Sequence, residues 1–82
     1  MTGPTNDTST ELATWLAERV AFYLKIPAEG VDRNASFTAL GLGSVHLICL
    51  AADVERRFER PVDSMLAWDH PTITAMATHL AG

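Results

Sequence analysis

The 82-residue sequence contains a single cysteine, Cys49, so it can form neither an intramolecular disulfide nor a Cys-x-x-Cys metal site. Basic residues are also few, since six Lys and Arg stand against ten Asp and Glu, for a net charge of −4. Proteins that bind the nucleic-acid backbone usually carry a basic patch, so this balance argues against nucleic acid as a partner. The one arginine cluster, within residues 56–60, is interleaved with glutamates and is typical of a solvated helix face.

Long apolar stretches are absent as well. No run approaches the roughly 20 apolar residues that a membrane-spanning helix needs, and the N-terminus has no apolar signal region. The three histidines lack the spacing of metal ligands, and no pair of residues suggests general acid–base catalysis. We therefore expect a cytoplasmic protein, or a domain cut from one, with no membrane partner, no metal and no catalytic residue.

The residues that are present favour one small helical domain. Hydrophobic residues make up 48% of the chain, which is enough for a core. Apolar residues at helical spacing predict helices over residues 9–24, from Ser44 to about Arg57, and from near Pro71 to just before Gly82, with a short helical turn over 63–68. We expect an all-α fold, a small four-helix bundle with a long first loop and a short third helix.

Expectations for the chain ends, the loop and the core follow from local signals. Thr8 and Glu11 match a capping box, so residues 1–8 are expected to form a disordered polar tail and residues 9–82 the folded domain. Phe37 is the expected anchor of the loop over residues 25–43. The expected core includes one face of the second long helix and two methionines, namely Leu47, Leu50, Ala51, Val54, Phe58, Met65 and Met76.

Ser44 is the strongest candidate for a functional site. It follows Gly41-Leu42-Gly43 and opens a periodic helix, which places a hydroxyl at a helix N-terminus beside little side-chain bulk. Free N–H groups there favour an anion, so the site suits attachment of a phosphate-linked group. Serine is also a preferred N-cap residue, and position alone would favour a cap, a preference that the surrounding residues reverse. A nucleophile elbow is excluded because His46 stands where the second glycine is needed, and no P-loop sequence follows.

The same helix has a second apolar stripe, on a face turned away from the core stripe. A helix that is apolar on two faces in so small a domain favours a surface kept for a partner. We therefore predict that this stripe, with His46 beside it, docks partner proteins; its members are Val45, Ile48, Cys49 and Ala52.

Three sequence segments together resemble the acyl carrier proteins of polyketide synthases. They are Asn34-Ala35-Ser36-Phe37-Thr38-Ala39-Leu40-Gly41-Leu42, then the helix opened by Ser44 and ending in Asp53-Val54-Glu55-Arg56-Arg57-Phe58, and finally Trp68-Asp69-His70-Pro71-Thr72-Ile73. The similarity runs from about Leu12 to Leu80. One departure is Gly43-Ser44-Val45 in place of the usual Asp-Ser-Leu, which removes a negative charge beside the serine.

The resemblance implies a carrier domain that catalyses nothing itself. A phosphopantetheinyl transferase would attach 4′-phosphopantetheine from coenzyme A to Ser44, with Gly43 and Leu42 beside the cofactor. The arm would hold acyl or polyketide intermediates as thioesters. Implied partners are that transferase, an acyltransferase or acyl-activating enzyme, and a ketosynthase, with the domain itself a monomer. The alternatives are a peptidyl carrier domain of a nonribosomal peptide synthetase, an unmodified helical interaction domain and, least favoured, a small enzyme.

Overall fold

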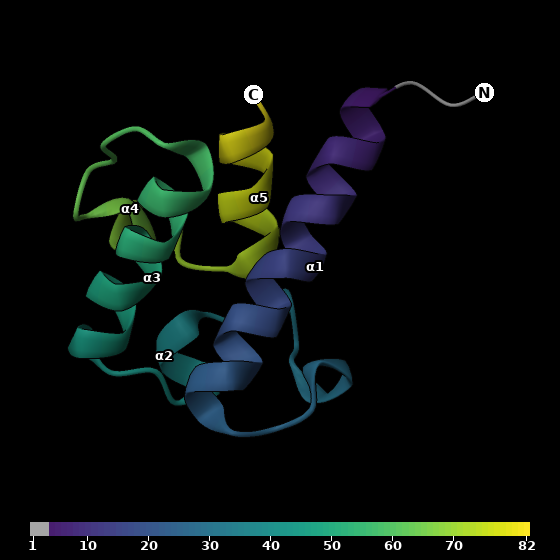
Figure 1. Cartoon of the computed structure of the whole chain (residues 1–82). Helices are drawn as coiled ribbons and strands as arrows, with labels where there is room; N and C mark the ends of the chain where they lie inside the picture. The colour runs from purple at the N-terminus through teal and green to yellow at the C-terminus, as the bar shows by residue number, and fades with distance from the viewer. Residues whose placement is uncertain (1–3) are drawn as a thin grey trace.

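The computed structural model describes the backbone of residues 4–82 and the side chains from Ser9 onward. Within these residues all the regular structure is helical, apart from one isolated bridge between Ser36 and Thr72. In chain order the helices are α1 (Pro4–Leu24), the 3-10 helix η1 (Ala28–Gly30), α2 (Phe37–Leu40), α3 (Ser44–Phe58), α4 (Leu66–Asp69) and α5 (Ile73–Ala81). Helix α1 lies along α5, while α3 and α4 form the other side of the bundle (Figure 1). The expected all-α bundle, with a long first loop and a short helix before the last, is confirmed.

Helix α1 begins earlier than the sequence indicates. It starts at Pro4, so Thr8 lies inside the helix and the expected capping box at its N-terminus is wrong. Part of the expected polar tail is therefore helical, and residues 1–3 lie outside the described part of the chain. The start of the folded domain at residue 9 stays a prediction.

The core is built from one stripe of each long helix. Its largest fully buried side chains come from α1, α2, α3 and α5, and they are Leu16, Val20, Phe37, Leu50, Val54, Ile73 and Met76. The expected core face of α3 is thereby confirmed, with Phe58 half-buried at its end. Met65 is a wrong prediction, because its side chain is 48% exposed and Leu66 and Ala67 fill the neighbouring core positions instead.

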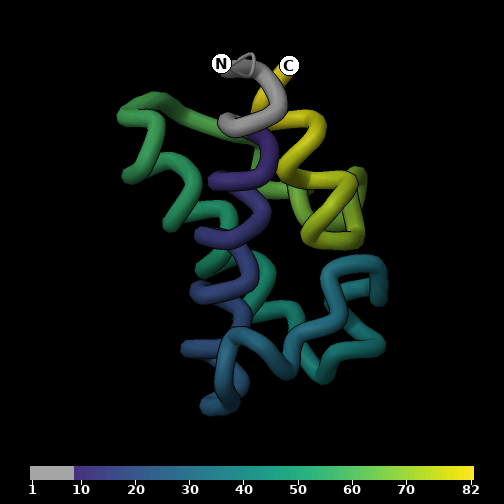
Figure 2. Tube along the Cα trace, turned by 90° about the vertical axis from the view of Figure 1, so that its right-hand side faces the viewer, coloured from purple at the N-terminus to yellow at the C-terminus, as the bar shows by residue number. Residues whose placement is uncertain are grey.

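The segment between α1 and α3 is folded over the end of the bundle that lies away from α5's C-terminus (Figures 1 and 2). Phe37 is 1% exposed and anchors it as expected, with Val31 and Leu42 also buried. The Phe37 N–H donates to the Pro71 carbonyl at 2.8 Å, which ties the segment to the start of α5. Gly41 closes α2 with a φ of +105°, a backbone conformation that favours glycine.

A side-chain cap sets the start of the last helix. Helix α5 begins at Ile73 because the Thr72 hydroxyl accepts from the Ala75 N–H at 3.0 Å, so the expected start at Pro71 is two residues too early. Helix α4 begins at Leu66, inside the predicted turn, and has no side-chain cap; the Asp63 carboxylate accepts from the Met65 N–H at 2.9 Å just before it. The Thr72 cap fixes the start of α5 more tightly than apolar spacing can.

Candidate functional site

Ser44 is the first residue of α3, and its side chain is exposed. The first backbone hydrogen bond of the helix is donated by the Leu47 N–H to the Gly43 carbonyl at 3.1 Å. The three N–H groups before it therefore point out of the helix end without a helical acceptor. A phosphate on the Ser44 oxygen would lie beside these donors and the positive end of a 15-residue helix.

The N-cap of α3 is Gly43, so Ser44 does not cap the helix. Capping comes instead from His46, whose Nδ1 accepts a hydrogen bond from the Gly43 N–H at 3.2 Å. Glycine has no side chain to reciprocate, so this is one half of a capping box. Within the described residues the Ser44 hydroxyl makes no hydrogen bond, which leaves it free to be modified.

The two residues before Ser44 play different parts. Gly43 is exposed, and a side chain added to it would meet nothing within 4 Å, so the aspartate usual in the family it resembles would fit there. Leu42 is 4% exposed, so its side chain packs in the core and does not line the surface around Ser44. The expected placement of Leu42 beside the cofactor is therefore indirect.

The second stripe of α3 is exposed at its two largest side chains. Val45 is 72% and Ile48 54% exposed, while Cys49 and Ala52 are half-buried. Exposed branched side chains on a helix with its own core face on the other side suit contact with another protein. His46, expected in the same surface, is half-buried, and its ring lies 5.6 Å from that of Tyr23.

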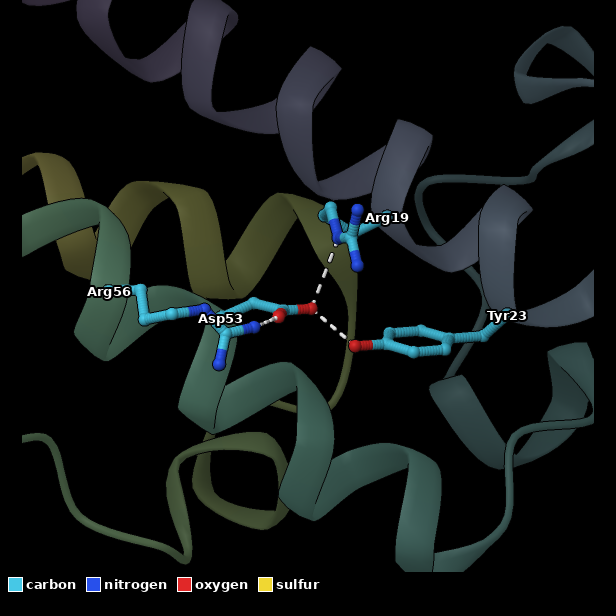
Figure 3. Close-up of polar contacts among 4 residues, drawn as sticks. All are labelled: Arg19, Tyr23, Asp53 and Arg56. Carbon is cyan, nitrogen blue, oxygen red and sulfur yellow. Dashed lines mark hydrogen bonds and ion pairs between the residues drawn. The ribbon is translucent and has the colours of Figure 1, made fainter.

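A polar cluster joins α1 to α3. Asp53 is 4% exposed, and its carboxylate accepts from the Arg19 Nε–H at 3.1 Å, from the Tyr23 hydroxyl and from Arg56 (Figure 3). Every buried side-chain nitrogen and oxygen among the described residues has a partner. The cluster fixes the spacing of the two helices, because three donors from both helices meet one buried charge.

The hydrogen bond from Tyr23 to Asp53 requires a protonated Tyr23 hydroxyl. Burial raises the pKa of Tyr23, and the hydrogen bond to Asp53 raises it further. A raised pKa in the folded state means that this contribution to stability is complete below about pH 10, the ordinary tyrosine pKa. It is lost as the pH rises through the higher pKa of the folded protein.

Replacing Asp53 by asparagine is expected to lower the free energy of unfolding by about 1–3 kcal/mol. Asparagine keeps the size of the side chain but places an amide between two guanidinium groups. The loss stays below that of a fully buried ion pair because Arg56 is 72% exposed and can return to water. Urea titration measures the change. Asp69→Asn, at an exposed residue, is the control and should shift stability by less than about 0.5 kcal/mol; equal effects of the two changes would show that the cluster contributes nothing special.

Sequence reasoning missed both the His46 cap and the Asp53 cluster. The signal for the first is a polar ring three residues after a glycine at a helix start, in the position that a capping-box glutamate occupies. For the second it is an aspartate next to the core residue Val54, together with Arg19 and Tyr23 four residues apart on α1. Neither signal can be recognised until it is known where the helices begin and which of them lie next to each other.

Two further features of the described residues bear on other functions. No group of three or more His, Cys, Asp or Glu side chains there is placed to hold a metal ion. Within the same residues, none of the helices combines the length and the apolar character needed to cross a membrane.

Comparison with known proteins points to one family. Residues 14–80 match the phosphopantetheine attachment site family. Among curated proteins, 6-methylsalicylic acid synthase of Penicillium expansum is 33% identical over 75 residues, which is 87% of this chain and 4% of that protein. A phenolphthiocerol/phthiocerol polyketide synthase of Mycobacterium tuberculosis is 30% identical over 71 residues, with the same coverage. The chain therefore spans about one twenty-fifth of these relatives' length.

Solved structures give the same fold from two kinds of carrier. A free-standing peptidyl carrier protein from an Acinetobacter baumannii secondary metabolic pathway has a TM-score of 0.83 and 28% identity, covering 88% of this chain and 90% of that one. The solution structure of acyl carrier protein LipD from Actinoplanes friuliensis has a TM-score of 0.73 and 35% identity, covering 99% and 91%. Fold alone therefore does not separate acyl from peptidyl carriers.

Proposed function

The chain belongs to the phosphopantetheine attachment site family, whose members are non-catalytic carrier domains, and on this premise we propose that Ser44 carries the 4′-phosphopantetheine arm. The observation that supports this most is the exposed hydroxyl without a hydrogen bond, within the described residues, on the first residue of α3. Attachment forms a phosphodiester at the Ser44 oxygen and breaks the pyrophosphate bond of coenzyme A, which releases adenosine 3′,5′-bisphosphate, with the hydroxyl proton passing to the transferase. The unpaired N–H groups of α3 would then stabilise the phosphate.

The cargo that we propose is an acyl or polyketide intermediate held as a thioester on the arm. Support comes from the curated relatives, which are polyketide synthases, and from the identity to an acyl carrier protein. A peptidyl carrier is the second candidate, because the peptidyl carrier structure has a TM-score of 0.83. We place the domain in the cytoplasm as a monomer; a single cysteine is in keeping with a reducing compartment.

One mass experiment tests the attachment and a second tests the cargo. The protein is incubated with coenzyme A and a broad-specificity phosphopantetheinyl transferase, and its intact mass should rise by one phosphopantetheine group, with peptide mapping locating it on residue 44. No mass gain would overturn the proposal. The modified protein is then offered acyl and aminoacyl groups by matching loading enzymes, and preferential loading with aminoacyl groups would favour the peptidyl carrier.

The exposed stripe of α3 is proposed as the surface that partner enzymes contact. These partners are the transferase, an acyltransferase or acyl-activating enzyme, and a ketosynthase. The stripe begins beside Ser44, so an enzyme that receives the arm in its active site would also reach Val45 and Ile48. Contact would bury apolar surface that is now exposed to water, and each Å² of apolar surface buried is favourable by about 25 cal/mol.

Ile48→Glu is expected to slow acyl transfer to or from a partner enzyme at least about tenfold, because a carboxylate would be desolvated in the contact. The melting temperature should stay nearly unchanged, since Ile48 is 54% exposed. Transfer kinetics and circular-dichroism melts measure the two effects. Thr38→Glu, at an exposed position of α2, is the charge-matched control and should transfer at the normal rate; if both variants transfer normally, docking lies elsewhere.

A further inference from the structure

An open cleft of about 360 Å³ lies between α1 and the second half of α3. Its lining residues come from both helices and are Trp15, Arg19, Asp53, Arg56 and Arg57. Three guanidinium groups face one carboxylate, which gives the lining a net charge of +2 in a chain whose net charge is −4. The cleft is therefore positively charged, although the protein as a whole is negatively charged.

The single carboxylate does not use up the donors of the cleft. Asp53 takes one N–H from Arg19 and one from Arg56, which leaves the remaining N–H groups of both guanidinium groups available. Arg57 has no ion pair with any described residue, and its guanidinium carbon lies 4.9 Å from the centre of the Trp15 ring. Stacking of this kind holds the planar group in place while its edge stays free to bind.

Nearby acids do not neutralise the cleft. Within the described residues, Glu11 and Glu18 of α1 form no ion pair with its arginines, and the Glu55 carboxylate accepts from the Val62 N–H at 3.0 Å. A carboxylate entering the cleft could therefore form charge-assisted hydrogen bonds that the protein itself does not supply.

We propose that this cleft binds an acidic segment of a partner protein, with carboxylate side chains on the arginines and an apolar side chain against Trp15. The cleft continues the docking stripe, because Ala52 and Arg56 are four residues apart on the same helix face. A partner on the stripe would thus extend its contact along α3 into the cleft. That the partner is an enzyme acting on the carrier rests on the proposed function. That the cleft binds an acidic segment does not depend on it.

A protein segment fits these observations better than a nucleic acid. Three arginines offer few phosphate contacts, and a chain with a net charge of −4 would repel a continuous polyanion. A peptide can place two or three carboxylates in the cleft and keep the rest of its chain uncharged. The charged contacts would act mainly by making the partner specific and by raising the rate of association, as is usual for charged contacts at interfaces.

The test uses as its probe a short capped peptide in which two glutamates flank one leucine and the other residues are uncharged, and it follows the two tryptophan indole N–H signals by NMR. The Trp15 signal should shift on titration, and that of Trp68, outside the cleft, should not. Arg57→Glu should weaken binding at least about tenfold, as expected for the loss of a charge-assisted contact. Arg60→Glu is the matched control, because Arg60 follows the same helix, over the Phe58 ring and outside the cleft; it should change binding less than about twofold, as a remote exposed charge does.

Each other outcome of this titration overturns the proposal. Equal weakening by the two variants would mean that only the net charge matters. Equal shifts with sodium acetate at the same carboxylate concentration would mean binding of simple ions, and tighter binding of a thymidine hexanucleotide would indicate a nucleic-acid partner. Attachment of phosphopantetheine should proceed normally in Arg57→Glu, because the cleft lies about 13–20 Å along the helix from its first residue. Failure of attachment in the unaltered protein would instead concern Ser44 alone.

Discussion

Ser44→Ala should abolish the mass gain that coenzyme A and a phosphopantetheinyl transferase produce in the unaltered protein. The hydroxyl oxygen is the atom that would form the phosphodiester, and alanine offers no substitute nucleophile. The change should be nearly silent for the fold. Ser44 is exposed, it is not the N-cap of α3, and within the described residues its hydroxyl makes no hydrogen bond. The free energy of unfolding should therefore change by less than about 0.5 kcal/mol, below the roughly 1 kcal/mol of a lost serine cap.

The matched control is Ser64→Ala, which removes another exposed serine hydroxyl and should keep the full mass gain. Intact-mass spectrometry and urea titration on both variants give the two readouts. A mass gain that persists in Ser44→Ala would move the attachment elsewhere. A loss of about 1 kcal/mol or more in that variant, the size of a lost cap, would instead give the hydroxyl a structural role that its surroundings do not show.

The sequence predicts Ser44 as the attachment residue from local signals, and attachment at Ser44 itself stays a prediction. A glycine-rich approach and a periodic apolar stripe are read over a few turns of chain, and both are confirmed around α3. The long loop was placed by the same reasoning, since an aromatic residue such as Phe37 in a polar stretch has few favourable positions other than the core.

The features that the sequence did not predict depend on which elements become neighbours. Asp53 appears on the sequence as one more acid in a charged helix, and only the approach of α1 brings Arg19 and Tyr23 to it. Met65 looks like a core residue by type, but α4 begins after it and turns the side chain outward. The bond that His46 makes is to the Gly43 backbone N–H, so it is recognised only once the start of α3 is known; the expected part of His46 in partner docking stays a prediction.

Helix α3 has two apolar faces, and the face that includes Leu50 is the core face, as the sequence predicts. The structure separates them by burial, since Leu50 is 0% exposed and Ile48 54% exposed. Truncating these two side chains should therefore cost very different amounts of stability, although they lie two residues apart on one helix.

Leu50→Ala is therefore expected to cost about 2–5 kcal/mol of unfolding free energy, because it removes buried methyl groups and leaves a cavity that the packed helices can only partly close. Ile48→Ala removes a similar amount of side chain from the solvent-facing stripe and should cost less than about 0.5 kcal/mol. Thermal melts and urea titrations of both variants measure the difference. For a domain of this size the first change is a large share of the total stability, since about 0.05–0.15 kcal/mol per residue holds such folds together. Similar losses in the two variants would mean that the exposed stripe is covered in solution, by another copy of the chain or by a rearranged bundle, and the docking surface would then have to be sought elsewhere.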